Sequence, residues 1–116
     1  MSVRKAVVES YIEGFRRVDH AQILSCLTDD VVWELHGYTT VTGKDAFDRE
    51  IENEATVGPP KLTIDRLVEE GDTVVGVGSG EVDRREGGLL RFVFCDVFSF
   101  TGDKISRLET YQVNLS

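Results

Sequence analysis

A single carboxylic acid, Asp96, lies within a run of phenylalanines in the C-terminal part of the sequence. The run reads Leu-Leu-Arg-Phe-Val-Phe-Cys-Asp-Val-Phe-Ser-Phe over residues 89–100. Because alternate residues of a strand point to the same face, Asp96 is expected to share one face with four rings, those of Phe92, Phe94, Phe98 and Phe100. An ionised carboxylate is costly to bury without a partner. Asp96 is therefore expected to be paired, hydrated or protonated.

Two interpretations of Asp96 follow from the sequence. In the first, burial raises its pKa, by up to about 3–5 units if burial is complete, and the acid binds a substrate oxygen or transfers a proton. In the second, the aspartate is structural and pairs with an arginine such as Arg107 or with a buried backbone N–H.

Tyr11 and His36 are the other candidates for catalysis. Tyr11 lies at the centre of an apolar helical stripe, where it is either a core residue or a hydroxyl directed into a pocket. An imidazole titrates near pH 6.5, which makes His36 a candidate base, with Glu34 as a second one and a surface loop histidine as the alternative. By strict alternation His36 shares a face with Glu34, so Trp33 and His36 line one pocket only if the chain bends between them.

Metal ions and cofactors are not expected. His20 and His36 have no partner at metal-ligand spacing, and no phosphate loop or dinucleotide fingerprint is present. Cys26 and Cys95 do not form a disulfide framework, and both are expected to be reduced, buried, small apolar residues rather than nucleophiles.

The composition indicates one globular domain spanning residues 1–116. The chain is 41% apolar and 29% charged, with a formal net charge of −8. An acidic protein of this kind is a poor partner for nucleic acid or for an anionic membrane surface. No apolar run approaches the length of a membrane span and the N-terminus does not read as a signal peptide, so a cytoplasmic location is expected.

Three helices are predicted in the N-terminal half. Apolar residues at 3.6-residue spacing predict the first over residues 3–18. Asp19 is expected to cap a short second helix that includes Leu27, with Gln22 completing a capping box. Thr42 or Gly43 is expected to cap the third, whose buried side is Ala46, Phe47, Ile51 and Ala55.

Strands dominate the remainder. A short strand is predicted over residues 31–35, a loop over 57–60, and four strands over residues 62–69, 73–82, 89–100 and 104–113. Helices followed by a meander indicate an α+β fold, in which a strongly curved, mostly antiparallel sheet wraps around the first helix. Such a cone encloses a pocket at its open end. Besides the candidates above, its expected lining is Trp33, Phe47, Phe92, Phe94, Phe98 and Tyr111.

Two segments carry a family resemblance. They are Ala-Val-Val-Glu-Ser-Tyr-Ile-Glu-Gly-Phe, continuing to Leu-Thr-Asp-Asp-Val-Val-Trp-Glu at residues 27–34, and Asp-Val-Phe-Ser-Phe at residues 96–100, continuing to Tyr111. In order and spacing the chain resembles the nuclear transport factor 2-like superfamily, in its SnoaL-like (polyketide cyclase-like) and ketosteroid isomerase-like branch. The resemblance implies that Tyr11 and Asp96 hydrogen-bond a substrate carbonyl oxygen. The position of the family's base is Leu35, which departs from the pattern, and the charged set of the superfamily's epoxide hydrolases is not recognisable.

These observations favour a cofactor-independent isomerase or cyclase that transfers a proton next to a carbonyl of a small apolar substrate. The alternatives are an apolar-ligand-binding module and a dimerising scaffold. The resemblance also implies a homodimer through the outer sheet face, which carries Val93, Cys95 and Val97.

Overall fold

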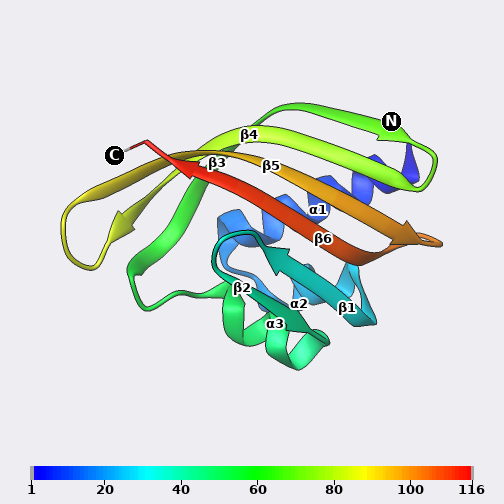
Figure 1. The fold of residues 1–116 in the computed structure, drawn as a ribbon, viewed down its shortest axis with the longest axis horizontal. Coiled ribbons are helices and arrows are strands. Elements are labelled where there is room, and N and C mark those ends of the chain that lie inside the picture. The colour runs from blue at the N-terminus through cyan, green and yellow to red at the C-terminus, as the bar shows by residue number, and fades with distance from the viewer. Residues whose placement is uncertain (1, 116) are drawn as a thin grey trace.

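The computed structural model describes residues 2–115, which form three helices and six strands in one layered unit (Figure 1). The helices are α1 (Val3–Arg17), α2 (His20–Ser25) and α3 (Lys44–Ile51). The strands are β1 (Leu27–Leu35), β2 (Thr39–Thr42), β3 (Thr56–Glu70), β4 (Thr73–Arg84), β5 (Leu89–Thr101) and β6 (Lys104–Asn114). They form a single sheet in the order β2-β1-β6-β5-β4-β3. The pair β1–β6 is parallel and the other pairs are antiparallel, so the predicted α+β fold with three helices on a mixed sheet is confirmed.

Helix α1 lies beneath the long strands and supplies much of the core (Figure 1). The Ser2 hydroxyl caps its N-terminus by accepting a hydrogen bond from the Lys5 amide at 3.1 Å. Its buried stripe includes Val8, Tyr11 and Ile12, as the periodicity predicts. The helix ends where Val18 adopts a left-handed conformation, with φ 50° and ψ 44°.

The second helix is shorter than predicted. Asp19 caps it, accepting from the Gln22 amide at 3.0 Å, but the Gln22 side chain donates to the Ser10 carbonyl and does not complete a capping box. The helix stops at Ser25, and Leu27 begins β1 four residues before the predicted start. Leu27 pairs there with Ile105 of β6, a partner that is remote in sequence and invisible to local periodicity.

Two further segments differ from the prediction. Residues 39–42, expected only to lead into a helix, form β2 against β1. Ala55 is exposed and lies outside α3, which ends at Ile51. The predicted loop at 57–60 is part of β3. Its two prolines are accommodated because β3 is an edge strand whose register shifts between Val57 and Lys61.

Glycines in β4 allow the rings of β5 to lie flat against it. A Cβ on Gly80 would lie 2.5 Å from Phe92 Cζ, and one on Gly78 would lie 2.9 Å from Phe94 Cζ and 2.2 Å from the Thr63 carbonyl oxygen. Each glycine is the direct cross-strand partner of the ring that it accommodates. The missing side chains thus let both rings fold toward β4 and bring β3 close.

No helix within residues 2–115 is long and apolar enough to cross a membrane. Both cysteines are free. Cys26 is buried as predicted, whereas Cys95 is only half-buried because it lies on the outer face of the sheet.

Candidate functional site

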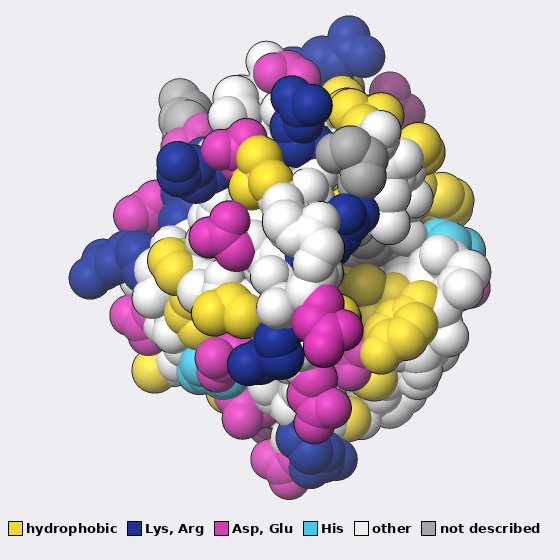
Figure 2. Space-filling model, turned by 90° about the vertical axis from the view of Figure 1, so that its left-hand side faces the viewer, with side chains coloured by type: hydrophobic (Ala, Val, Ile, Leu, Met, Phe, Trp, Pro, Cys, Tyr) yellow, Lys and Arg dark blue, Asp and Glu magenta, His cyan; other side chains and the backbone are white. Residues whose placement is uncertain are grey.

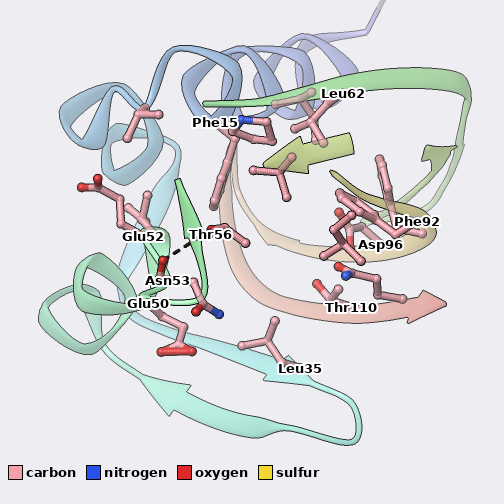
Figure 3. Close-up of a pocket in the computed structure, with 18 of the residues that line it drawn as sticks. Phe15, Leu35, Glu50, Glu52, Asn53, Thr56, Leu62, Phe92, Asp96 and Thr110 are labelled. Atoms are coloured by element: carbon pink, nitrogen blue, oxygen red, sulfur yellow. Dashed lines mark hydrogen bonds between the residues drawn. The ribbon is translucent and has the colours of Figure 1, made fainter. Parts of the chain in front are cut away.

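A cavity of about 510 Å³ opens between α1, the end of α3 and the concave face of the sheet. Its inner wall is largely apolar and aromatic, and its mouth carries polar and charged groups from residues 50–54, Arg85 and Gln112. Figure 2 shows the end of the molecule where these elements meet, with hydrophobic side chains in a hollow among acidic and basic ones. In Figure 3, Asp96, Phe92 and Thr110 lie together on the sheet side, across the opening from Glu50 and Glu52.

Asp96 lines the cavity and is 8% exposed. Its Oδ1 has no hydrogen-bond partner among the described residues. Burial raises the pKa of this carboxyl from 3.8 to about 7, and a hydrogen bond from the Thr110 side chain partly opposes that rise. Arg107, the alternative structural partner, lies on the outer face, where its Nη2 is 2.6 Å from Glu34 Oε1. Asp96 is therefore an acid that is partly protonated at neutral pH, with one oxygen free to meet a ligand.

Thr110 connects Asp96 to the indole of Trp33. Trp33 Nε1 donates to Thr110 Oγ1 at 2.9 Å, which leaves the threonine proton free to be donated to Asp96. Thr110 is buried and is the cross-strand partner of Asp96 on β6. Its role was not predicted from the sequence, because it depends on the strand register, which places this hydroxyl directly beside the carboxyl.

Tyr11 lines the same cavity from α1 and is almost fully buried. Burial, and secondarily the charge of Asp96, raises the pKa of its hydroxyl well above the ordinary value, so the group stays protonated. Its ring packs edge-on against Phe98 with a centroid distance of 5.4 Å. Tyr11 is thus a neutral hydrogen-bond donor whose ring is held by packing and which is close enough to Asp96 for its charge to affect the pKa of the hydroxyl.

The predicted aromatic lining divides into two layers. Trp33, Phe92 and Phe94 line the cavity. Phe47 and Phe98 are not among its lining residues and are fully buried behind it. Phe47 stacks on Trp33 with a centroid distance of 4.4 Å, so the second layer fixes the orientation of the first.

His36 and Tyr111 do not reach the cavity, contrary to the expected lining. They stack on each other on the outer face with a centroid distance of 4.2 Å. His36 Nδ1 is 3.5 Å from Glu34 Oε2, and its Nε2 is 3.8 Å from Glu109 Oε2. The chain does not bend between Trp33 and His36: Leu35 lines the cavity, and strict alternation then turns Glu34 and His36 outward. This placement removes both as bases for a ligand in the cavity.

The acidic mouth of the cavity was not predicted from the sequence either. Glu50, Glu52 and Glu54 line the opening. From the sequence, these three acids are expected on the solvated side of the third helix. Glu52 Oε2 lies 2.7 Å from His20 Nε2, while His20 Nδ1 lies 2.6 Å from Asp48 Oδ1. This double contact ties α2 to α3 and fixes the carboxyl side of the mouth. Within residues 2–115 no group of three or more His, Cys, Asp or Glu side chains is arranged to hold a metal ion.

Comparison with known proteins identifies the family. A family model described as a SnoaL-like domain matches residues 8–108. The chain belongs to the SnoaL-like domain family. No curated protein matches this SnoaL-like chain.

Solved structures share the fold over nearly the whole SnoaL-like chain. An NTF2-like protein of unknown function from Burkholderia pseudomallei is 26% identical, with a TM-score of 0.84 over 96% of this chain and 91% of its own. TerC, co-crystallised with polyporic acid, is 24% identical, with a TM-score of 0.85 over 95% and 91%. A LEH-like epoxide hydrolase from M. tuberculosis is 18% identical, with a TM-score of 0.83 over 96% and 83%. The suspected nuclear transport factor 2-like superfamily is thus confirmed.

Proposed function

We propose that this SnoaL-like protein binds a small, largely apolar carbonyl compound in its cavity and transfers a proton next to the carbonyl without a cofactor. The observation that carries the proposal is the free, buried Oδ1 of Asp96. A carboxyl with a pKa of about 7 is half ionised at neutral pH, which suits a group that both takes and returns a proton. The aromatic wall provides the apolar surface for the rest of the molecule.

The two polar groups take different roles. Tyr11 donates a hydrogen bond to the carbonyl oxygen and stabilises the enolate charge that develops there. Asp96, as the carboxylate, takes the proton from the adjacent carbon, and the C–H electron pair enters the enolate. The protonated acid then returns the proton to the same or a conjugated carbon, so no oxidant or reductant is needed.

Asp96 acts here as the base, whereas the family resemblance implies a hydrogen-bond donor beside a separate base. The reason is the lining itself. Leu35 occupies the position of the family's base, and His36 lies on the outer face. Among the described residues Asp96 is the one buried carboxyl, so it is the proton acceptor that the closed part of the cavity offers.

Relatives of the same fold support a small organic ligand. TerC was crystallised with polyporic acid, and another relative is described as an epoxide hydrolase. The ligand and the activity of these relatives are not assigned to this chain.

Hydrogen exchange in D₂O tests the proposal without knowledge of the natural substrate. The protein is incubated with a panel of aryl and alicyclic ketones, and deuterium incorporation beside the carbonyl is followed by NMR. We expect wild-type protein to accelerate exchange, Asp96→Asn to lower the rate by about 10²–10⁴-fold, and Tyr11→Phe to lower it less. The wild-type rate should rise with pH through about 7 as Asp96 ionises. Exchange that is unchanged in Asp96→Asn would refute the assignment.

A ligand-binding module is the second candidate. It is favoured because, among the described residues, Asp96 is the one buried carboxyl and no histidine lines the cavity beside it. In that case ketones bind to the wild-type protein, but no exchange above the buffer rate is seen.

A further inference from the structure

The charges of the cavity are strongly one-sided. Its charged lining residues are the acids Glu50, Glu52, Glu54 and Asp96 and the single base Arg85. The guanidinium of Arg85 is held at the rim, with its Nε donating to the Glu54 carbonyl at 2.8 Å. A ligand that enters therefore passes an acidic mouth before it reaches an acidic group inside.

The partners of the mouth acids only partly neutralise them. Glu52 shares its charge with His20, which lies 2.7 Å away and whose pKa is raised by the side chains of Asp48 and Glu52. Glu50 accepts a hydrogen bond from Tyr38, a neutral group that leaves its charge in place. Arg85 donates a hydrogen bond to the backbone carbonyl of Glu54 and not to its carboxylate. The opening thus keeps an excess of negative charge.

A second observation points independently to a ligand in the same cavity. Asp96 is more than nine-tenths buried, lines the cavity and has no partner for Oδ1 among the described residues. The aromatic rings of Phe15, Trp33 and Phe92 line the same cavity. Glu50 and Glu52 lie across the opening from Asp96 in Figure 3, so an apolar body that spans the cavity places one polar end at Asp96 and the other near these mouth acids.

We propose that the cavity selects apolar carbonyl compounds that carry a protonated amine at the end remote from the carbonyl, and that it rejects the same skeletons carrying a carboxylate. The amine is attracted to the mouth acids and can lie over an aromatic face, whereas a carboxylate meets like charge at the entrance. This inference rests on the proposed use of the cavity for a carbonyl compound, and it adds the charge class of the ligand.

Three probes with one skeleton test the charge selection: 4-(aminomethyl)acetophenone, 4-(hydroxymethyl)acetophenone and 4-(carboxymethyl)acetophenone. Trp33 is the single tryptophan of the chain and lines the cavity, so quenching of its fluorescence gives the Kd of each probe. At about 20 mM salt we expect the amine to bind about tenfold or more tightly than the carboxylate, with the alcohol between them. At about 0.5 M salt the spread should shrink, because the mouth is open to solvent.

The variant Glu50→Gln/Glu52→Gln/Glu54→Gln removes the mouth charges. We expect its three Kd values to agree within about twofold. Its matched control is Asp65→Asn/Asp72→Asn/Asp103→Asn, which removes the same net charge from exposed positions outside the cavity lining and should keep the wild-type order. The salt series on the wild-type protein gives the same answer if the mouth variant is poorly folded.

Equal affinities for the three probes, the carboxylate binding most tightly, or no quenching by any of them would each overturn the inference. Its failure is separable from failure of the proposed function. A flat charge order together with ketone exchange that depends on Asp96 rejects the charge selection alone, while the amine-first order without exchange rejects the proton transfer alone.

Discussion

At the scale of single residues, the row Gly76–Asp96–Thr110 across three strands explains the behaviour of the acid. Gly76 offers no side chain on one side, and Thr110 offers a single hydroxyl on the other. Water and counter-charges are largely excluded, so burial dominates and the pKa rises to about 7. The environment is set by three backbone positions, not by a neighbouring charge.

The raised pKa of Asp96 makes the stability of the wild-type protein depend on pH. Between its unfolded value near 3.8 and the folded value of about 7, the folded state holds a proton that the unfolded state has lost, so stability falls as pH rises. The full effect is at most about 4 kcal/mol. We therefore expect Asp96→Asn to gain stability relative to wild type between pH 4 and pH 8, by up to that amount, in urea unfolding. Asp103→Asn is the exposed control, and parallel pH curves for wild type and Asp96→Asn would contradict the burial.

Residue alternation was enough to predict the environment of Asp96, because strand periodicity depends only on local sequence. The same rule, applied strictly, already placed His36 beside Glu34, and the structure follows it. Thr110 and the mouth acids could not be found this way. Their role depends on which strand lies beside β5 and on where the chain turns after α3.

At the scale of elements, β4 shapes the cavity because its glycines carry no side chains. Two of its glycines lie directly under Phe94 and Phe92, and the rings occupy the space that side chains would fill. Because the rings lie in the space above these glycines, they take up less of the cavity.

Gly80→Ala should push Phe92 into the cavity, because the new Cβ would lie 2.5 Å from its Cζ and 2.8 Å from Leu62 Cδ2. Overpacking costs about 1–3 kcal/mol, only partly offset by the about 0.5–1 kcal/mol gained when a glycine leaves a strand. We expect lower stability in urea and weaker binding of the acetophenone probes. Ser79→Ala, on the opposite face of the same strand, is the control. Wild-type affinity in Gly80→Ala would show that the ring moves elsewhere.

Strong local patterns predicted most elements, and the failures have one cause. The stripe of α1 and the alternation of β5 are long and regular. By contrast, Leu27 joins β1 and residues 39–42 form β2 because remote strands pair with them. Pro59 and Pro60 read as a loop, since nothing local reveals that β3 lies at an edge.

At the scale of the whole molecule, the convex face of the sheet carries an apolar band that the helices do not cover. Val68, Val93 and Val113 are 52%, 39% and 60% exposed. Strand register places them in neighbouring rows. Val68 pairs with Val75, which pairs with Val97, and Val93 pairs with Val113, while the pair of Cys95 and Tyr111 lies between these two rows. The acid–base cluster of His36, Glu34, Glu109 and Arg107 borders this band.

We still expect a homodimer through this outer face, as the resemblance implied. Sedimentation velocity at micromolar concentration should give the dimer mass, and Val93→Lys should shift the protein toward monomer because it places a charge in the apolar band. Val3→Lys introduces the same side chain at an exposed position on α1 and should leave the dimer intact. A wild-type monomer would contradict the expectation.

The parallel pairing of β1 with β6 has a consequence for biosynthesis. Among the described residues, β1 joins the sheet only through β6, apart from its short partner β2, and β6 follows the other five strands in the sequence. In a nascent chain that ends before residue 104, Trp33 on β1 and Asp96 on β5 are not yet held together, because β6, which pairs with both strands, is missing. Because such long-range closure is slow, folding should proceed with the pocket assembled last.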